Sequence, residues 1–207
     1  MRKIFKFLFN DNPILIFTLG LCSVLAITTT FEKSYIMGII ILIALILCNI
    51  ITSIIKKFIK EEIRIPVYII IIATIITIIQ IFISRYSPNL YKAFGIYLPL
   101  LTVNCVLLGS CLSYASSHSI KDSFINALKN GLGYLVVISI IGFLRELLGS
   151  GKITIMNDIS LLTGYRFIID VFNNDILPNK IFLTSGGAFI LLGLVMGIIR
   201  KLNRGDN

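Results

Sequence analysis

The sequence predicts an all-α integral membrane protein with six transmembrane helices, arranged as an inverted 3+3 repeat with broken first and fourth spans. Three observations support this prediction. Of the 207 residues, 57% are hydrophobic and only 14% are charged, whereas a typical soluble domain has about 25% charged residues. The apolar residues form long blocks of roughly the 20 residues that a helix needs to cross a bilayer. Gly, Asn, Pro and Cys residues interrupt the first and fourth blocks.

Six apolar blocks are expected to span the membrane as helices, because the bilayer holds no water to satisfy free backbone groups. They run over about 13–31, 35–55, 65–84, 94–114, 127–148 and 181–199. No small-residue cleavage site follows the first block, which we therefore expect to be retained. Pro66 opens the third span, where a missing N–H is tolerated. Pro99 lies inside the fourth span and is expected to kink or break it.

The basic residues lie in the connections between the blocks and predict the orientation. With the N-terminus in the cytoplasm, twelve Lys and Arg residues fall inside and seven outside, so both termini are expected to be cytoplasmic. The net charge of +9 reflects this bias, because no basic stripe with interleaved aromatics suggests nucleic-acid binding. We expect a multi-pass protein of the cytoplasmic membrane, in contact with lipid and without a nucleic-acid partner.

The six spans divide into two halves of three, within a single membrane domain over residues 1–207. Because three is odd, the two halves, about 1–90 and 91–207, must enter the membrane from opposite faces. The second span of each half opens with glycine, at Gly38 and at Gly131 and Gly133. Breaks at matching positions of the two halves point to a site near the middle of the membrane.

Each half carries one cysteine in a polar break of its first span. Cys22 follows Gly20, and Cys105 follows Asn104. Thiolates are the usual ligands of iron–sulfur clusters, and two are half of the set that a cluster needs. The alternative is that both cysteines pack as small apolar residues. We expect Gly20 and Asn104 to shape the backbone around the two thiols.

The other residues with chemical potential form no complete site. Cys48 and Cys111 are expected to be packing residues, since no closely spaced run of cysteines suggests a four-ligand cluster in one chain. Arg145 and Glu146 at the end of the fifth span point in different directions, and interfacial anchoring is the simpler interpretation. His118 lies in a polar turn. No catalytic triad, phosphate-binding loop or complete metal-ligand set is evident.

Several motifs together resemble one family of membrane subunits, over nearly the whole chain and in the same order. The motifs are Leu19-Gly20-Leu21-Cys22, Arg64-Ile65-Pro66-Val67-Tyr68, Leu98-Pro99-Leu100, Val103-Asn104-Cys105-Val106-Leu107-Leu108-Gly109 and Arg145-Glu146-Leu147-Leu148-Gly149. With these motifs the chain is similar to the E subunits of the Rnf electron-transport complex, and also to the D subunits of sodium-translocating NADH:quinone oxidoreductases.

The resemblance implies a subunit of a translocase (EC 7 class) with no complete active site of its own. It implies that Cys22 and Cys105 bind a [2Fe–2S] cluster shared with an A-type paralogue, which has the opposite topology and supplies two further cysteines. The complex would pass electrons between ferredoxin and NAD, coupled to Na⁺ or H⁺ translocation, and its other subunits would carry flavins and iron–sulfur clusters. An Nqr D-type role with quinone is the nearest alternative.

Two departures and two further hypotheses accompany the resemblance. The family often has Pro where this chain has Ser23, and charged residues where Ser110-Cys111-Leu112 follows Gly109.

A small secondary transporter is one alternative, and it would use polar groups near the middle of the membrane. A membrane scaffold without a cofactor is the other. The polar candidates for a transporter are Thr18, Thr28, Asn49, Thr102 and Asn104.

Overall fold

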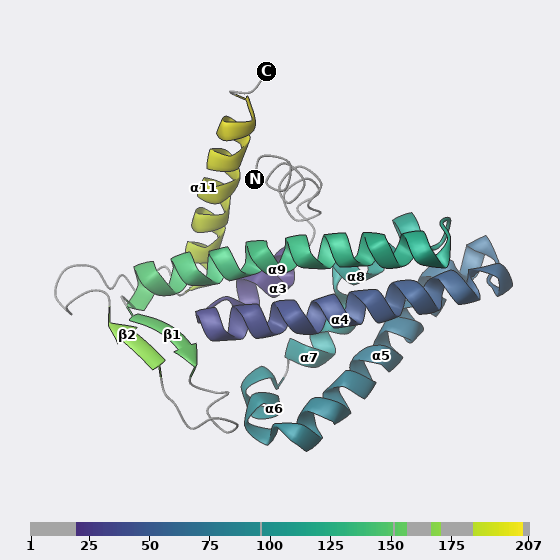
Figure 1. Ribbon diagram of the computed structural model, residues 1–207, viewed down its shortest axis with the longest axis horizontal. Helices are drawn as coiled ribbons and strands as arrows, with labels where there is room; N and C mark the ends of the chain where they lie inside the picture. Colours follow the sequence, from purple (N-terminus) through teal and green to yellow (C-terminus); the bar gives the residue numbers. More distant parts are fainter. Residues whose placement is uncertain (1–19, 96, 151, 157–166, 171–183, 205–207) are drawn as a thin grey trace.

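The computed structural model describes residues 20–95, 97–150, 152–156, 167–170 and 184–204. Most of these residues are helical (Figure 1). The longer helices are α4 (Phe31–Ile55), α5 (Arg64–Tyr86), α9 (Ile120–Ser150) and α11 (Ser185–Arg204). The shorter elements are α3 (Leu21–Ile27), η1 (Lys56–Phe58), η2 (Glu61–Ile63), α6 (Pro88–Phe94), α7 (Tyr97–Leu100), η3 (Leu101–Val103), α8 (Cys105–Ser110), η4 (Cys111–Ala115), β1 (Lys152–Met156) and β2 (Phe167–Asp170).

Four helical segments of the described chain are long and apolar enough to cross a membrane. They are Phe31–Phe58, Glu61–Tyr86, Tyr97–Ala115 and Ile120–Gly149. Each corresponds to one of the predicted second to fifth spans. Residues 13–19 of the predicted first span lie outside the described residues, and α3 covers part of the remainder. In α11 the apolar part, Ser185–Gly197, is shorter than the four candidate spans.

The long helices α4 and α9 run side by side in opposite directions and form the centre of the fold (Figure 1). Glycines at their contact allow the backbones to approach closely. A Cβ atom on Gly38 would lie 3.2 Å from the Leu135 Cα, and one on Gly131 would lie 3.3 Å from the Leu42 Cα. Each glycine thus packs against a leucine that lies four residues beyond the other glycine. This reciprocal arrangement is the pattern of a two-fold contact.

Large apolar side chains are exposed along α5. Ile70, Ile78 and Phe82 are each at least 60% exposed, whereas Tyr68 and Ile72 are fully buried. So many exposed large apolar side chains on one helix are unusual on a soluble monomer and suit contact with lipid. Together with the four apolar helices, they agree with a multi-pass membrane protein.

The predicted fourth span is interrupted, as expected, and the interruption lies at Asn104, in the polar break predicted around Cys105. The chain passes from α7 through the 3₁₀ segment η3 to Asn104, whose backbone is extended with φ −66° and ψ 124°, and then into α8. Pro99 was expected to break the span. It lies instead in the first turn of α7, where its missing N–H removes no helical bond. After α8, the helix widens into the π-helical segment η4.

One two-stranded sheet interrupts the otherwise helical chain among the described residues. Strands β1 and β2 pair antiparallel, with Lys152 opposite Asp170 and Ile153 opposite Ile169. The sheet lies in the connection between α9 and α11, at the end of the α4–α9 pair (Figure 1). Both strands fall between the predicted spans 127–148 and 181–199, where no strand was expected.

Contacts between connections show which ends of the helices lie together. The Lys56 ammonium and the Ser53 hydroxyl both donate to the carbonyl of His118, the latter at 3.1 Å. At the other end of the α4–α9 pair, the backbone N–H of Phe31 donates to Glu146. The turns after α4 and before α9 therefore lie at the same end, in agreement with the predicted alternation of connections.

Candidate functional site

Cys22 and Cys105, predicted from separate halves of the chain, meet in the structure. Cys22 lies in the first turn of α3, and Cys105 is the first residue of α8. The two thiols lie close enough for each to influence the other electrostatically. The backbone N–H of Gly20 donates to the Cys105 sulfur at 2.8 Å, across 85 residues of sequence. The break in the first span and the break in the fourth therefore form one site.

Gly20 has a geometry that only glycine can adopt here. Its φ is +87°, in the left-handed region where a Cβ atom is strained. A Cβ atom at this position would also lie 2.7 Å from the Val106 side chain and 2.9 Å from the Tyr134 ring. The missing side chain lets the N–H approach the Cys105 sulfur. The role of Gly20 in shaping the backbone around a cluster stays a prediction, and it would use this geometry.

Ser23 is the centre of a buried hydrogen-bond network behind the two cysteines. Its hydroxyl donates to the Gly20 carbonyl at 3.0 Å and accepts from Asn104 Nδ2 at 3.2 Å. Its oxygen also lies 2.5 Å from the Tyr134 hydroxyl. A serine hydroxyl has one donor hydrogen and two acceptor lone pairs. Because its hydrogen goes to Gly20, Tyr134 must be the donor, and all the bonding capacity of Ser23 is then used.

Asn104 joins the two breaks through both ends of its amide. Its Oδ1 accepts from the backbone N–H of Val106 at 2.9 Å and so caps the N-terminus of α8. Its Nδ2 reaches Ser23, and the side chain is 1% exposed. Asparagine is among the favoured residues at an N-cap because its oxygen satisfies a free N–H. This capping fixes where α8 begins, and hence where Cys105 lies.

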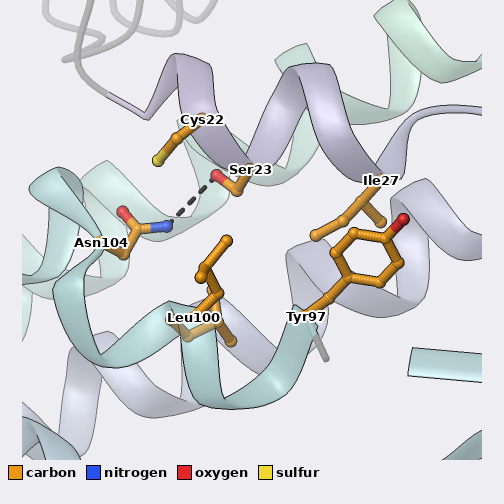
Figure 2. A pocket seen from close by; sticks show the side chains of 7 residues that line it. Cys22, Ser23, Ile27, Tyr97, Leu100 and Asn104 are labelled. Atoms are coloured by element: carbon orange, nitrogen blue, oxygen red, sulfur yellow. Dashed lines mark hydrogen bonds between the residues drawn. The ribbon is translucent and has the colours of Figure 1, made fainter. Parts of the chain in front are cut away.

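A shallow depression lies beside Cys22, and Cys105 is not part of its lining. Figure 2 shows Cys22 beside it, with Asn104 bonded to Ser23 and with Leu100, Ile27 and Tyr97 around the rest. Cys22 is exposed, whereas Cys105 is only partly exposed. One thiol is therefore available to a ligand or to another protein surface, and the other is held from within the chain.

The two cysteines provide thiol ligands of the kind that iron–sulfur clusters use, but fewer than a cluster needs. Two thiols and a backbone N–H directed at sulfur suit an iron–sulfur cluster, whose sulfurs accept hydrogen bonds. Among the residues that the structure describes, no three His, Cys, Asp or Glu side chains lie close enough together to hold a metal ion. The residues present therefore fit half of a four-thiolate cluster.

Cys48 and Cys111 form a second, fully buried pair. Both are 0% exposed, and their side chains lie near each other between α4 and η4. Ile72 of α5 belongs to the same apolar core. Their complete burial agrees with the predicted packing role, although the sequence spacing did not indicate that they would meet.

The polar residues considered for a transporter do not converge on one point. Thr28 bonds to Val24 and Arg145, Asn49 bonds to Ser110, and Asn104 belongs to the cysteine site. Within the described part of the chain, each of the three has different hydrogen-bond partners. Thr102 is partly exposed, and Thr18 lies outside the described residues.

Arg145 and Glu146 differ most from expectation. The sequence favoured interfacial anchoring at a helix end, but the two side chains are only 1% and 2% exposed.

Ser23 was noted only as a departure from proline, and Tyr134 was not singled out. Ser23 is the third residue of α3, where a backbone N–H has no helical partner, so either serine or proline is compatible with the helix. The sequence could have indicated a role for Ser23 only through the position of its hydroxyl next to the candidate ligand Cys22.

Comparisons with known proteins agree with the resemblance drawn from the motifs. The family model described as "Rnf-Nqr subunit, membrane protein" matches residues 1–196. The E subunit of a proton-translocating ferredoxin:NAD(+) oxidoreductase complex from Clostridium ljungdahlii is 36% identical, over 96% of this chain and 87% of its own length. The E subunit of a Na(+)-translocating complex of the same type from Acetobacterium woodii is 34% identical, over 96% and 95%. The D subunit of the Na(+)-translocating NADH-quinone reductase from Serratia proteamaculans is 33% identical, over 94% and 90%.

Proposed function

We propose that this chain, which belongs to the Rnf-Nqr family of membrane subunits, supplies Cys22 and Cys105 as two ligands of a [2Fe–2S] cluster shared with a partner subunit. The observation that carries the proposal is the meeting of these two thiols, with the Gly20 N–H directed at Cys105. The chain is a membrane subunit of an ion-translocating oxidoreductase, as its relatives' names indicate. Such a cluster, when bound, would accept and pass on one electron at a time.

The residues of this chain would prepare the site in three ways. Gly20 donates to the Cys105 sulfur, which stabilises negative charge on it. Both cysteines lie in the first turn of a helix, where backbone N–H groups lack helical partners and the helix dipole favours an anion. The buried network of Ser23, Asn104 and Tyr134 keeps the inner side of the site free of unsatisfied polar groups.

The exposed Cys22 indicates that a partner completes the site. An A-type paralogue with two further cysteines would cover the depression and supply the other two thiolates. Other subunits of the complex, carrying flavins and iron–sulfur centres, would exchange electrons with this pair. The relatives are named for proton or sodium translocation at almost the same identity to this chain, so their names do not decide which ion moves.

We extend the proposal to the architecture of the whole chain, a single membrane domain of six spans in an inverted 3+3 repeat. The reciprocal contacts of Gly38 with Leu135 and of Gly131 with Leu42 support it. Equivalent helices of two inverted halves must cross in opposite directions about a two-fold axis, as α4 and α9 do. Both termini would be cytoplasmic, in accordance with the distribution of basic residues.

The alternatives differ from the proposal in what they require. A secondary transporter needs polar groups that converge, and the polar residues of the described chain bond to separate partners. A scaffold needs no thiol at a depression. A D-type subunit of an NADH:quinone oxidoreductase would use the same cysteine pair in a complex with a different electron acceptor.

The four cysteines of the chain provide an internal control for the test. The chain is purified together with an A-type partner and is analysed for iron, for acid-labile sulfide and by EPR after reduction. We expect Cys22→Ala and Cys105→Ala each to reduce the EPR signal of the shared cluster at least tenfold. Cys48→Ala and Cys111→Ala, which alter the other pair, should retain it. An iron-free wild-type pair, or a cluster unaffected by both ligand changes, would contradict the proposal.

A further inference from the structure

Arg145 and Glu146, at the end of α9, are buried charges that the cysteine site does not use. Their side chains are 1% and 2% exposed. Ionised side chains at membrane depth are energetically costly and are retained mainly where they have a function. Their hydrogen-bond partners therefore indicate what that function is.

The Arg145 guanidinium binds the C-terminal end of α3. Its Nη1 donates to the Leu25 carbonyl at 3.0 Å and to the Thr28 hydroxyl at 2.8 Å. Leu25 lies in the last turn of α3 and Thr28 is its C-cap. The last carbonyls of a helix lack helical partners and carry its partial negative charge, so a cation is favourable there. Arg145 thus stabilises the short helix that contains Cys22.

Glu146 makes the complementary contact with the following helix. Its Oε2 accepts from the backbone N–H of Phe31, the first residue of α4, at 2.6 Å. The N-terminus of a helix carries partial positive charge, so a carboxylate is favourable at this position. Neighbouring residues of opposite charge therefore hold the two sides of the link between α3 and α4. The sequence analysis expected the two side chains to point in different directions, and this arrangement requires that they do.

A third contact connects the same group to the last helix. The Nη2 of Arg145 donates to the carbonyl of Thr184 at 3.0 Å, immediately before α11. A planar guanidinium can bind several acceptors in fixed directions, which an ammonium cannot do. The end of α9 therefore joins α3 and α11 through Arg145 and α4 through Glu146.

We infer that Arg145 and Glu146 form a clamp, the Arg145–Glu146 clamp, whose role is to hold α3 so that the Cys22 thiol stays beside Cys105. Helix α3 has seven residues, too few to be stable without tertiary contacts. Its N-terminal end is fixed by Gly20 and Ser23, and the clamp fixes its other end. Arg145 and Glu146 are therefore positioning residues. Only the consequence for a bound cluster rests on the function proposed above.

The first test measures the position of Cys22 without any cluster. The full chain, carrying Cys48→Ala and Cys111→Ala, is oxidised in its membranes with copper phenanthroline, and the rate of Cys22–Cys105 disulfide formation is followed. We expect Arg145→Met to reduce this rate at least tenfold and Arg145→Lys to reduce it less. Glu146→Gln, which keeps an acceptor oxygen, should have a smaller effect than Glu146→Ala. Lys121→Met, an exposed change on the same helix, should react at the wild-type rate.

The second test uses the chain purified with its A-type partner. We expect Arg145→Met to change the EPR line shape and the midpoint potential of the cluster that remains. Arg145→Lys, which keeps the positive charge, should change both less. A purely structural loss would instead reduce the signal without altering its shape. If Arg145→Met does not accumulate in the membrane, Arg145→Lys and Glu146→Ala provide the same comparison.

The two proposals can fail separately. Wild-type rates of disulfide formation in both Arg145→Met and Glu146→Ala, together with an unchanged spectrum, would overturn the clamp. An iron-free wild-type complex would contradict the cluster, whereas slowed cross-linking in the clamp variants would still support the role of Arg145 and Glu146 in positioning Cys22.

Discussion

At the scale of single residues, the cysteine site depends on Gly20. This residue provides the N–H that reaches Cys105, the carbonyl that Ser23 binds, and the space into which Tyr134 and Val106 pack. All three contributions require a left-handed backbone without a side chain. A single methyl group added at this position therefore tests the whole arrangement.

We predict that Gly20→Ala destabilises the chain and displaces the site. The left-handed backbone should cost about 1–2 kcal/mol for alanine. The overlap with Val106 at 2.7 Å and Tyr134 at 2.9 Å should add about 1–3 kcal/mol. Unfolding in mixed detergent micelles would measure the change in free energy, and the rate of Cys22–Cys105 cross-linking would report the displacement.

Gly193→Ala is the matched control for this prediction. A Cβ atom at Gly193, in α11, would meet no atom within 4 Å. Alanine there should leave the stability unchanged or raise it by about 0.5–1 kcal/mol, since alanine favours a helix. Equal effects of the two substitutions would show that Val106 and Tyr134 do not pack closely against Gly20.

Some of these residues could be predicted from the sequence and others could not. Cys22, Cys105, Gly20 and Asn104 are local signals, because each interrupts an apolar block. The roles of Tyr134 and Arg145 depend on partners more than 100 residues away. Nothing in their own surroundings in the sequence reveals that they bind the end or the side of α3.

At the scale of elements, the contact between α4 and α9 depends on close approach at two glycines. The Cβ positions of Gly38 and Gly131 lie 3.2 and 3.3 Å from the Cα atoms of Leu135 and Leu42. Backbone atoms cannot move aside as a side chain can, so a methyl group must separate the helices. Small residues at such positions are typical of helix pairs in membranes.

We predict that Gly38→Ala and Gly131→Ala each destabilise the chain by a similar amount, about 1–3 kcal/mol. The similarity follows from the reciprocal contacts. Leu42→Ala should partly rescue Gly131→Ala, and Leu135→Ala should partly rescue Gly38→Ala, because the added methyl groups would also meet Leu42 Cδ1 at 3.0 Å and Leu135 Cγ at 3.1 Å, which these changes remove. Double-mutant cycles on the free energy of unfolding would measure the coupling.

The exchanged pairs provide the control for this prediction. Leu42→Ala should not rescue Gly38→Ala as well as Leu135→Ala does, since Leu42 faces the other glycine. Gly197→Ala, with no atom within 4 Å of its Cβ position, should be nearly neutral. Equal rescue by both leucine changes would argue against a two-fold contact.

The predicted elements match the structure where hydrophobic length determines them. The blocks 35–55 and 65–84 correspond to α4 (Phe31–Ile55) and α5 (Arg64–Tyr86). The start of α9 at Ile120 was missed, because its first turn is polar and apolar length alone does not detect it. The break at Asn104 depends on the amide as an N-cap, and the η4 segment depends on packing, so neither follows from hydropathy.

At the scale of the whole molecule, the arrangement of the ends supports one topology. The Lys56 side chain and the Ser53 hydroxyl meet the His118 carbonyl at one end of the α4–α9 pair. The Glu146 contact with Phe31 lies at the other end. The buried charges of the clamp and the connections after α4 and before α9 therefore lie at opposite ends of the α4–α9 pair. The bias of Lys and Arg would place the end with these connections in the cytoplasm.

We predict that the connections near Lys57 and Ser117 face the cytoplasm and that Arg85 faces outward. Single cysteines would be introduced at these three exposed positions in a chain without native cysteines, followed by labelling with a membrane-impermeant maleimide. Lys57→Cys and Ser117→Cys should react in inverted vesicles but not in intact cells, and Arg85→Cys should show the reverse. Ile78→Cys, 60% exposed but expected to face lipid, should react slowly from both sides, because the reaction needs water to form the thiolate. Labelling of Lys57→Cys in intact cells would reverse the proposed orientation, and labelling of Lys57→Cys and Ser117→Cys from different sides would contradict the shared end itself.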